Sequence, residues 1–451
     1  MENNEPRYCD VREQQIPAFQ VNKREVWPSK MFTIKLELQD FIKRHPDIPV
    51  YDASQGDGGS SLGGIPKDEL AEALKRYLPD ERTTQYGNPI GREDVRKAIF
   101  ENYYRFDPET GLTPDHIIIG DGGRDILQKW YQVVVQSTGS FGNNILVSAA
   151  PWGSYPQGPY INGMNVLMAP GSIDNGFKIT PEAIDKCIEF SARDNRKIAG
   201  LIITSPDNPT GNYMDADYMI SLIEHASERG IPHIFADLIY QSVTDPEVGR
   251  YNVNGIINRL SEKAKSRVSF MDGLTKVAGA SNLRNAHLVC TTDEFSQKMK
   301  GVATHTVIPN AIGEAVALEI YSQREPTEHP WMQKVILPTS ESRRIVREKL
   351  TELGYTFVAD QGYYAFIRVK EWFGKKIPAG EQWQDSNGNT VDTINDVVTL
   401  KSYLTTRCGL AVIHGTVFKQ PDYIRFSYAN SPEYTGGSIM RLHESLGQLD
   451  N

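Results

Sequence analysis

Short apolar runs recur between about residue 90 and residue 300, and stretches with helical periodicity separate them. The runs are rich in β-branched residues and do not alternate with polar ones, which is typical of strands buried on both faces. Six runs are predicted strands: residues 117–119, 145–147, 201–203, 234–236, 268–270 and 288–290. Strands that alternate with helices predict an α/β fold whose sheet is mainly parallel and carries helices on both faces.

The chain before this central region is patterned differently. It holds an amphipathic stretch over residues 31–43, a glycine-rich loop over residues 56–64 and a helical pattern over residues 66–77. No internal repeat is visible along the chain.

After Glu325 the pattern changes again. A long amphipathic helix is predicted over residues 338–353, followed by strands at 363–367 and 423–427. Residues 371–395 are polar and rich in turn formers, which indicates an inserted hairpin or lid. This part is predicted to be a smaller α+β domain. The predicted organisation is an N-terminal arm with part of the small domain over 1–85, a large domain over 86–325, and a small C-terminal domain over 326–451.

Composition narrows the class of protein. The 48 Lys and Arg against 57 Asp and Glu leave a net charge of −9, so nucleic acid is not an expected partner. The four cysteines are far apart and the histidines lack ligand spacing, so neither a disulfide framework nor a metal site is predicted. The N-terminus is acidic and no apolar run approaches the ~18 residues of a membrane span, so we expect a cytoplasmic enzyme or binding protein.

Polar residues follow the predicted strands. In α/β sheets ligand chemistry gathers at the carboxyl ends of strands, and five strand ends or the turns after them carry such groups. They are Gly122-Gly123-Arg124, Asn208 within Asn208-Pro209-Thr210-Gly211, Asp237 with Tyr240, Lys276, and Arg284 eight residues later.

Each group alone has an ordinary structural explanation. The glycines suit a plain tight turn as well as a phosphate cradle, and an Asn-Pro pair suits a turn. A carboxylate such as Asp237 also suits a helix cap, and most lysines are solvated. A lysine just past a buried strand, however, is partly desolvated, which lowers its pKa and suits Schiff-base chemistry.

In combination, these motifs resemble the fold-type I pyridoxal-phosphate enzymes, the aspartate aminotransferase superfamily of class I/II aminotransferases. The resemblance covers roughly residues 50–445, and the order and spacing of the motifs agree over about 300 residues. It implies a three-layer fold with a mainly parallel seven-stranded sheet in a large domain, a smaller α+β domain, and a homodimer with shared active sites.

The resemblance also implies roles for individual residues. Lys276 corresponds to the lysine that forms the Schiff base with pyridoxal 5′-phosphate, and Asp237 pairs with the pyridinium nitrogen. The other expected cofactor contacts are Gly122, Gly123, Arg124 and Arg284 at the phosphate, Asn208 and Tyr240 at the phenolic oxygen, Trp152 stacked on the ring, and Tyr86 reaching the neighbouring subunit's phosphate. Gly56, Asn208 and Arg425 correspond to substrate-binding positions, with Arg425 on the α-carboxylate.

The chain departs from the family pattern near the lysine. Gly273 replaces a Ser or Thr and so removes a phosphate hydroxyl, while Ala286 and Asn282 replace glycines beside Arg284. We expect Arg124 to compensate for the missing hydroxyl. The glycine-rich loop reads Gly56-Asp57-Gly58, where the family has Gly-x-Pro.

The predicted function is transfer of an amino group from an L-amino acid to a 2-oxo acid. The alternative keeps the cofactor but ends in elimination, replacement, cyclisation or oxidation of an amino acid in a specialised biosynthetic pathway, because the cofactor motifs do not separate these outcomes. A DNA-binding regulator is disfavoured by the acidic chain. A nicotinamide dehydrogenase is disfavoured because the glycine turns lack Gly-x-Gly-x-x-Gly.

Overall fold

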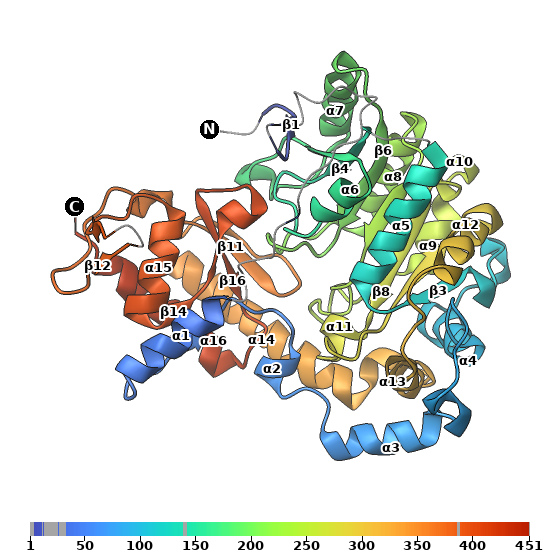
Figure 1. Ribbon diagram of the computed structural model, residues 1–451, viewed down its shortest axis with the longest axis horizontal. Coiled ribbons are helices and arrows are strands. Elements are labelled where there is room, and N and C mark those ends of the chain that lie inside the picture. Colours follow the sequence, from blue (N-terminus) through green and yellow to red (C-terminus); the bar gives the residue numbers. More distant parts are fainter. Residues whose placement is uncertain are drawn as a thin grey trace.

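The computed structural model describes residues 4–10, 12, 26, 33–138, 142–385 and 388–450. Helices surround a large sheet, and a second group of elements from the C-terminal part of the chain lies beside it, together with the blue helix α1 (Figure 1). No helix in these described ranges is long and apolar enough to cross a membrane.

The large sheet has eight strands in the order β1-β5-β4-β6-β7-β8-β9-β3. Strands β5, β4, β6, β7 and β8 run parallel, whereas β1 is antiparallel to β5 and β9 is antiparallel to both β8 and β3. In chain order the strands are β1 (Arg7–Tyr8), β3 (Ile117–Gly120), β4 (Asn144–Val147), β5 (Asn165–Met168), β6 (Ile198–Thr204), β7 (Ile234–Asp237), β8 (Val268–Gly273) and β9 (Ala286–Cys290).

Both faces of this sheet are buried, which explains the unalternated apolar runs. Along β3, Ile117 and Ile119 enter one core while Ile118 enters the other, as the period of two requires. One face packs against α5 (Gly123–Thr138), α6 (Gln157–Ile161) and α12 (Asp293–Thr304). The other packs against α4 (Glu93–Ala98) with its π-helical continuation (Ile99–Tyr104), α7 (Pro181–Arg193), α8 (Ala216–Glu228), α9 (Val253–Arg259), α10 (Glu262–Lys265) and α13 (Ala311–Tyr321).

A second, antiparallel sheet lies at the other side of the molecule. Its four strands are β10 (Phe357–Val358), β11 (Tyr364–Arg368), β16 (Tyr423–Ser427) and β15 (Ile413–His414). Its apolar core includes residues of the helices α14 (Pro330–Glu352), α15 (Val397–Cys408) and α16 (Pro432–Gly447). From the N-terminal part, α1 (Thr33–Arg44) packs on α15, and β2 (Tyr51–Asp52) pairs in parallel with β14 (Leu410–Ala411).

Three α-helices remain among the described residues, and they pack on α13 or α14. They are α2 (Gly59–Leu62), α3 (Lys67–Tyr77), which packs on α13, and α11 (Leu274–Val277), which contains the predicted cofactor lysine. Figure 1 shows α3 and α13 side by side at the bottom of the view.

The α/β fold and all six predicted strands are confirmed. The strand number differs from the predicted seven because the two-residue strand β1 adds to the edge of β5. Helix α14 begins at Pro330, eight residues before the predicted start. The prediction put Pro338 at the first turn, where proline is tolerated, but Pro330 takes that place, so Pro338 costs the helix one backbone hydrogen bond.

The polar insert over 371–395 forms the predicted hairpin, with β12 (Trp383–Gln384) antiparallel to β13 (Thr390–Val391). Within the insert, the backbone of Lys376 pairs with that of Asp450 at the C-terminal end. None of the insert's described residues lines the cavity at the strand ends of the large sheet.

Candidate active site

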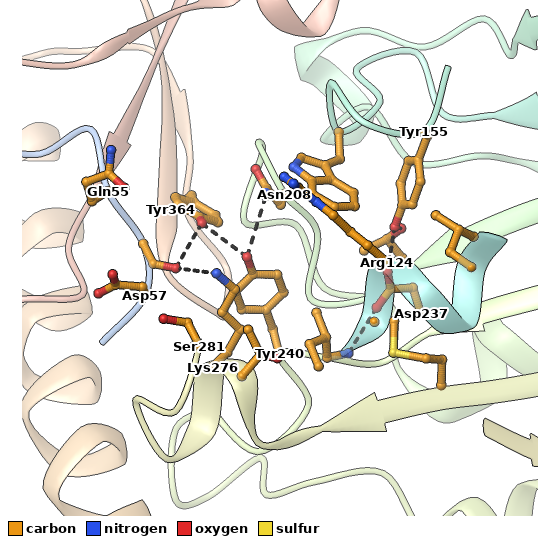
Figure 2. Close-up of a pocket in the computed structure, with 18 of the residues that line it drawn as sticks. Gln55, Asp57, Arg124, Tyr155, Asn208, Asp237, Tyr240, Lys276, Ser281 and Tyr364 are labelled. Carbon is orange, nitrogen blue, oxygen red and sulfur yellow. Dashed lines mark hydrogen bonds between the residues drawn. The ribbon is translucent and has the colours of Figure 1, made fainter. Parts of the chain in front are cut away.

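One cavity of about 570 Å³ collects residues at or after the ends of five strands, β3, β4, β6, β7 and β8. The loop before α2 and the strands β11 and β16 close its other side (Figure 2). Of the predicted site residues it is lined by Gly56, Gly123, Arg124, Trp152, Asn208, Asp237, Tyr240, Lys276, Arg284 and Arg425. The remaining lining residues are Ser54, Gln55, Asp57, Leu127, Tyr155, Thr204, Ile239, Met271, Thr275, Ser281, Asn282 and Tyr364.

Lys276 lies on α11, the short helix that directly follows β8. Its Nζ donates to the carbonyl oxygen of Gly56 at 2.7 Å and lies 5.8 Å from the centre of the Tyr240 ring. Burial lowers the pKa of the Lys276 amine below its ordinary value. A desolvated amine held by a neutral carbonyl is easily deprotonated, which makes it a competent nucleophile and proton acceptor.

Asp237 ends β7 and is almost fully buried. Its Oδ2 accepts the Tyr155 hydroxyl at 2.8 Å and its Oδ1 accepts the backbone N–H of Ile239 at 3.1 Å. Burial raises the pKa of the Asp237 carboxyl to about 6. The helix-cap explanation fails, because the next described α-helix after Asp237 begins only at Val253. The carboxylate therefore projects into the cavity, where a protonated ring nitrogen would offset its burial.

Hydrogen bonds connect the far wall of the cavity to Lys276. Asn208 Nδ2 lies 3.5 Å from the Tyr240 hydroxyl, which lies 3.1 Å from the Tyr364 hydroxyl. Tyr364 in turn donates to the Gly56 carbonyl at 3.4 Å, the same oxygen that holds Lys276 (Figure 2). Asn208 and Tyr240 come from the loops after β6 and β7, and Tyr364 comes from β11.

Arg425 lies in the middle of β16 and is 3% exposed. Its Nη1 donates to Asn208 Oδ1 at 2.8 Å and its Nη2 to the Ser54 carbonyl at 2.7 Å, while Nε has no partner. Within the described part of the chain no carboxylate lies at ion-pair distance from it. Arg343 is buried as well, but its charge is paired with a carboxylate, because its Nη1 lies 2.6 Å from Asp245 Oδ1. A buried guanidinium without a counter-ion calls for an anion from outside the chain.

The turn between β3 and α5 lies beside two further arginines, Arg284 and Arg124. Arg284 Nη2 donates to the Asp121 carbonyl at 3.2 Å, and a Cβ on Gly122 would lie 1.9 Å from that nitrogen. Burial and the charge of Arg284 both lower the pKa of Arg124, whose Cζ lies 5.3 Å from the centre of the Trp152 ring. Two guanidinium groups beside the N-terminus of a 16-residue helix form a site for a multiply charged anion.

Two predicted residues do not line the cavity. Gly122 lies just behind it, where its lack of a side chain leaves room for Arg284. Tyr86 is 94% exposed, in keeping with a role outside its own chain's cavity, which stays a prediction. Sequence reasoning missed Tyr155 and Tyr364. Tyr155 comes three residues after Trp152 and Tyr364 lies in the predicted strand 363–367, but only the folded chain brings them to Asp237 and Gly56.

A nucleophilic lysine, a carboxylate, an arginine pair and a solitary buried arginine define a site for an anionic, nitrogen-ring cofactor and a carboxylate substrate. These features fit pyridoxal phosphate. The glycine at 122 and the arginine pair suit its phosphate, and the buried Asp237 suits its ring nitrogen.

The chain belongs to the aminotransferases of class I and II, whose family model matches residues 55–435. It is 26% identical over 385 residues to the aspartate aminotransferase of Geobacillus stearothermophilus, covering 84% of this chain and 88% of that protein. It is 23% identical over 388 residues to a probable aspartate/prephenate aminotransferase of Rickettsia felis, covering 85% and 86%. The crystal structure of the Rhizobium meliloti aspartate aminotransferase shares the fold, with a TM-score of 0.75, 18% identity, and coverage of 95% and 98%.

The predicted class of enzyme is thus confirmed: the protein is a pyridoxal-phosphate-dependent aminotransferase.

Proposed function

We propose that this enzyme moves the α-amino group of an L-amino acid to a 2-oxo acid, with Lys276 as the catalytic base and Arg425 as the α-carboxylate binder. The observation that carries the proposal is the buried Arg425, which lacks a counter-ion among the described residues and lies on the same hydrogen-bonded wall as Lys276. We also propose a cytoplasmic homodimer that shares its active sites.

Each residue has a defined task in this scheme. Arg425 binds both oxygens of the substrate carboxylate in a fork, which fixes the orientation of the substrate Cα. Asp237 would hold a proton on the ring nitrogen of the cofactor, and Arg284 with Arg124 would hold its phosphate. Asn208 and Tyr240 would orient its phenolic oxygen.

Proton transfer falls to Lys276. Once bound, the cofactor supplies an electron sink for the charge that develops at Cα. Burial lowers the pKa of the Lys276 amine and so favours its neutral form, which can accept the proton from the substrate Cα and donate it again. The same residues then serve the 2-oxo acid in reverse.

The decisive experiment treats the holoenzyme with borohydride and maps the labelled peptide, and then repeats the treatment with Lys276→Ala. We expect the cofactor label on Lys276 alone and no turnover in Lys276→Ala, because no other lysine among the described residues lines the cavity. Lys263→Ala, at an exposed lysine, is the matched control and should keep both label and turnover. A label on another lysine would overturn the assignment.

The reaction outcome is tested separately with a panel of L-amino acids and one 2-oxo acid. We expect the amino group to appear on the 2-oxo acid in a one-to-one ratio with the loss of the amino acid. Ammonia or an oxidised product without a new amino acid would show the alternative outcome.

A further inference from the structure

The hydroxyl of Tyr364 lies between the two halves of the site. It is 3.1 Å from the Tyr240 hydroxyl on one side and 3.4 Å from the Gly56 carbonyl on the other (Figure 2). A phenol has only one proton to donate. Tyr364 therefore donates to either Tyr240 or Gly56, but not to both at once.

The fold is shaped around this hydroxyl. Tyr364 is 2% exposed, and a Cβ on Gly56 would lie 2.2 Å from its oxygen, so only glycine lets the two approach. The face of the same ring stacks on Arg425, whose Cζ lies 4.3 Å from its centre. One side chain thus touches the carboxylate-binding arginine, the neighbouring tyrosine and the carbonyl that holds Lys276.

We propose that Tyr364 is a positioning residue that couples Tyr240 to the amine of Lys276 through the Gly56 carbonyl. The inference rests on the roles proposed above for Lys276, Tyr240 and Arg425. It goes beyond them because it gives Tyr364 and the Gly56 carbonyl a task in the reaction cycle.

The coupling follows from the number of donors. When Tyr240 donates its proton to the cofactor oxygen, its own oxygen is left as an acceptor and Tyr364 donates to it. The Gly56 carbonyl is then left to the Lys276 amine, which donates to it at 2.7 Å. When Tyr240 donates to Tyr364 instead, Tyr364 donates to Gly56, and this carbonyl then accepts from both Tyr364 and Lys276, which weakens its bond to the lysine. Cofactor orientation and lysine position therefore change together.

The first test is Tyr364→Phe, which removes the hydroxyl but keeps the ring on Arg425. In the substrate-free holoenzyme, we follow the pH midpoint at which the cofactor absorbance changes. In the variant, Tyr240 no longer accepts the hydrogen bond from the Tyr364 hydroxyl, which makes Tyr240 a weaker donor to the phenolic oxygen of the cofactor. The deprotonated form of the bound cofactor is then less stabilised. We expect the midpoint to rise by on the order of half a unit to one unit.

Steady-state kinetics supply the second readout. We expect Tyr364→Phe to lower kcat by on the order of 10- to 100-fold while KM for the amino acid changes little, since only the hydroxyl bonds are lost. Tyr364→Leu, which also removes the ring from Arg425, should raise KM in addition. Tyr403→Phe is the matched control, because Tyr403 is fully buried but its hydroxyl contacts Ser445, Gln448 and Cys408, none of which lines the cavity.

An unchanged midpoint and unchanged kcat in Tyr364→Phe would overturn the inference, as would a change in KM alone. If Tyr364→Phe does not fold, Gly56→Ala tests the same bond, because its methyl group would displace the hydroxyl. That variant should then show the same rise of the midpoint, and an unshifted midpoint would overturn the inference. Failure of the proposed function is seen separately, as the absence of cofactor label on Lys276 in the parent enzyme.

Discussion

At the scale of the residue, burial is what makes Arg425 a candidate carboxylate binder. In strand β16 it lies between Ile424 and Phe426, both fully buried, and within the described part of the chain its guanidinium is bonded to neutral acceptors alone. The apolar neighbours by themselves predict a strand that is half buried. The structure shows full burial, which strengthens the demand for an external anion.

Arg425→Lys should therefore keep the fold and the cofactor but bind amino acids poorly, because an ammonium group cannot form the two parallel bonds of the fork. We expect kcat/KM to fall on the order of 100-fold or more, about 2.7 kcal/mol. Steady-state kinetics with an amino acid and with an amine that lacks a carboxylate provide the measurement and its control. Equal losses for both substrates would show that Arg425 has a purely structural role.

Asp237 makes stability depend on pH in the cofactor-free protein. Burial raises the pKa of its carboxyl from 3.8 to about 6, so between these values the native state holds more protons than the unfolded state. The free energy of unfolding must then fall as pH rises through this window, by up to about 3 kcal/mol from this group. Asp207 and Asp272 are shifted in the same direction.

Asp237→Asn should remove one part of this fall. We expect the difference in unfolding free energy between pH 4.5 and pH 7, measured by denaturant titration of the cofactor-free protein, to be smaller in the variant than in the parent. Comparing the two proteins cancels the contribution of Asp272, while that of Asp207 becomes smaller in the variant, because the Asp237 charge helps to raise the pKa of Asp207. Identical differences would mean that Asp237 is solvated in the free protein.

At the scale of the element, the antiparallel pair β8 and β9 explains the departures near the lysine. Gly273 pairs with Ala286, and a Cβ on Gly273 would lie 2.6 Å from the Cα of Ala286 and 2.9 Å from its Cβ. A side chain at 273 would also lie 2.7 Å from the Asn285 carbonyl oxygen, so it would meet the partner backbone as well as the Ala286 methyl group. The glycine at 273 is thus required mainly by the backbone of β9 and in part by Ala286.

Gly273→Ser alone should destabilise the protein, on the order of 1–3 kcal/mol, because the added side chain overpacks the strand pair. Ala286→Gly in the same chain should relieve part of this cost, which a double-mutant cycle measures as a coupling energy. Thermal unfolding of the four proteins is the measurement. Strictly additive effects would show that the positions do not share the space.

At the scale of the whole molecule, the cavity is built by segments that lie up to 371 residues apart, such as Ser54 and Arg425. Tyr86 is exposed on the surface of the single chain. The domain boundaries at residues 85 and 325 stay predictions. Helix α1 and strand β2 pack with C-terminal elements, as the prediction of a mixed small domain expects, while β1 joins the large sheet.

Mixing a Lys276→Ala chain with a Tyr86→Ala chain tests the shared site. If Tyr86 serves the partner, each hybrid dimer has one intact site and one site damaged twice, so we expect activity well above the mean of the two parent variants. Turnover of a refolded equimolar mixture is the measurement, and each variant refolded alone is the control. Activity equal to the mean would contradict sharing.

The sequence by itself determined the fold class, six strands of the large sheet and most of the residues that line the cavity, because these depend on local patterns: apolar runs, turn formers and polar groups at strand ends. It missed β5 and the two-residue strands outside the predicted hairpin, such as β1 and β2, whose existence depends on partners elsewhere in the chain. Tertiary structure alone decided the positions of Tyr364 and Tyr155, the contact of Gly273 with Ala286, and the lack of a described counter-ion at Arg425. The physical reason is distance along the chain: Gly56 and Tyr364 meet across 308 residues, and no local pattern records such a contact.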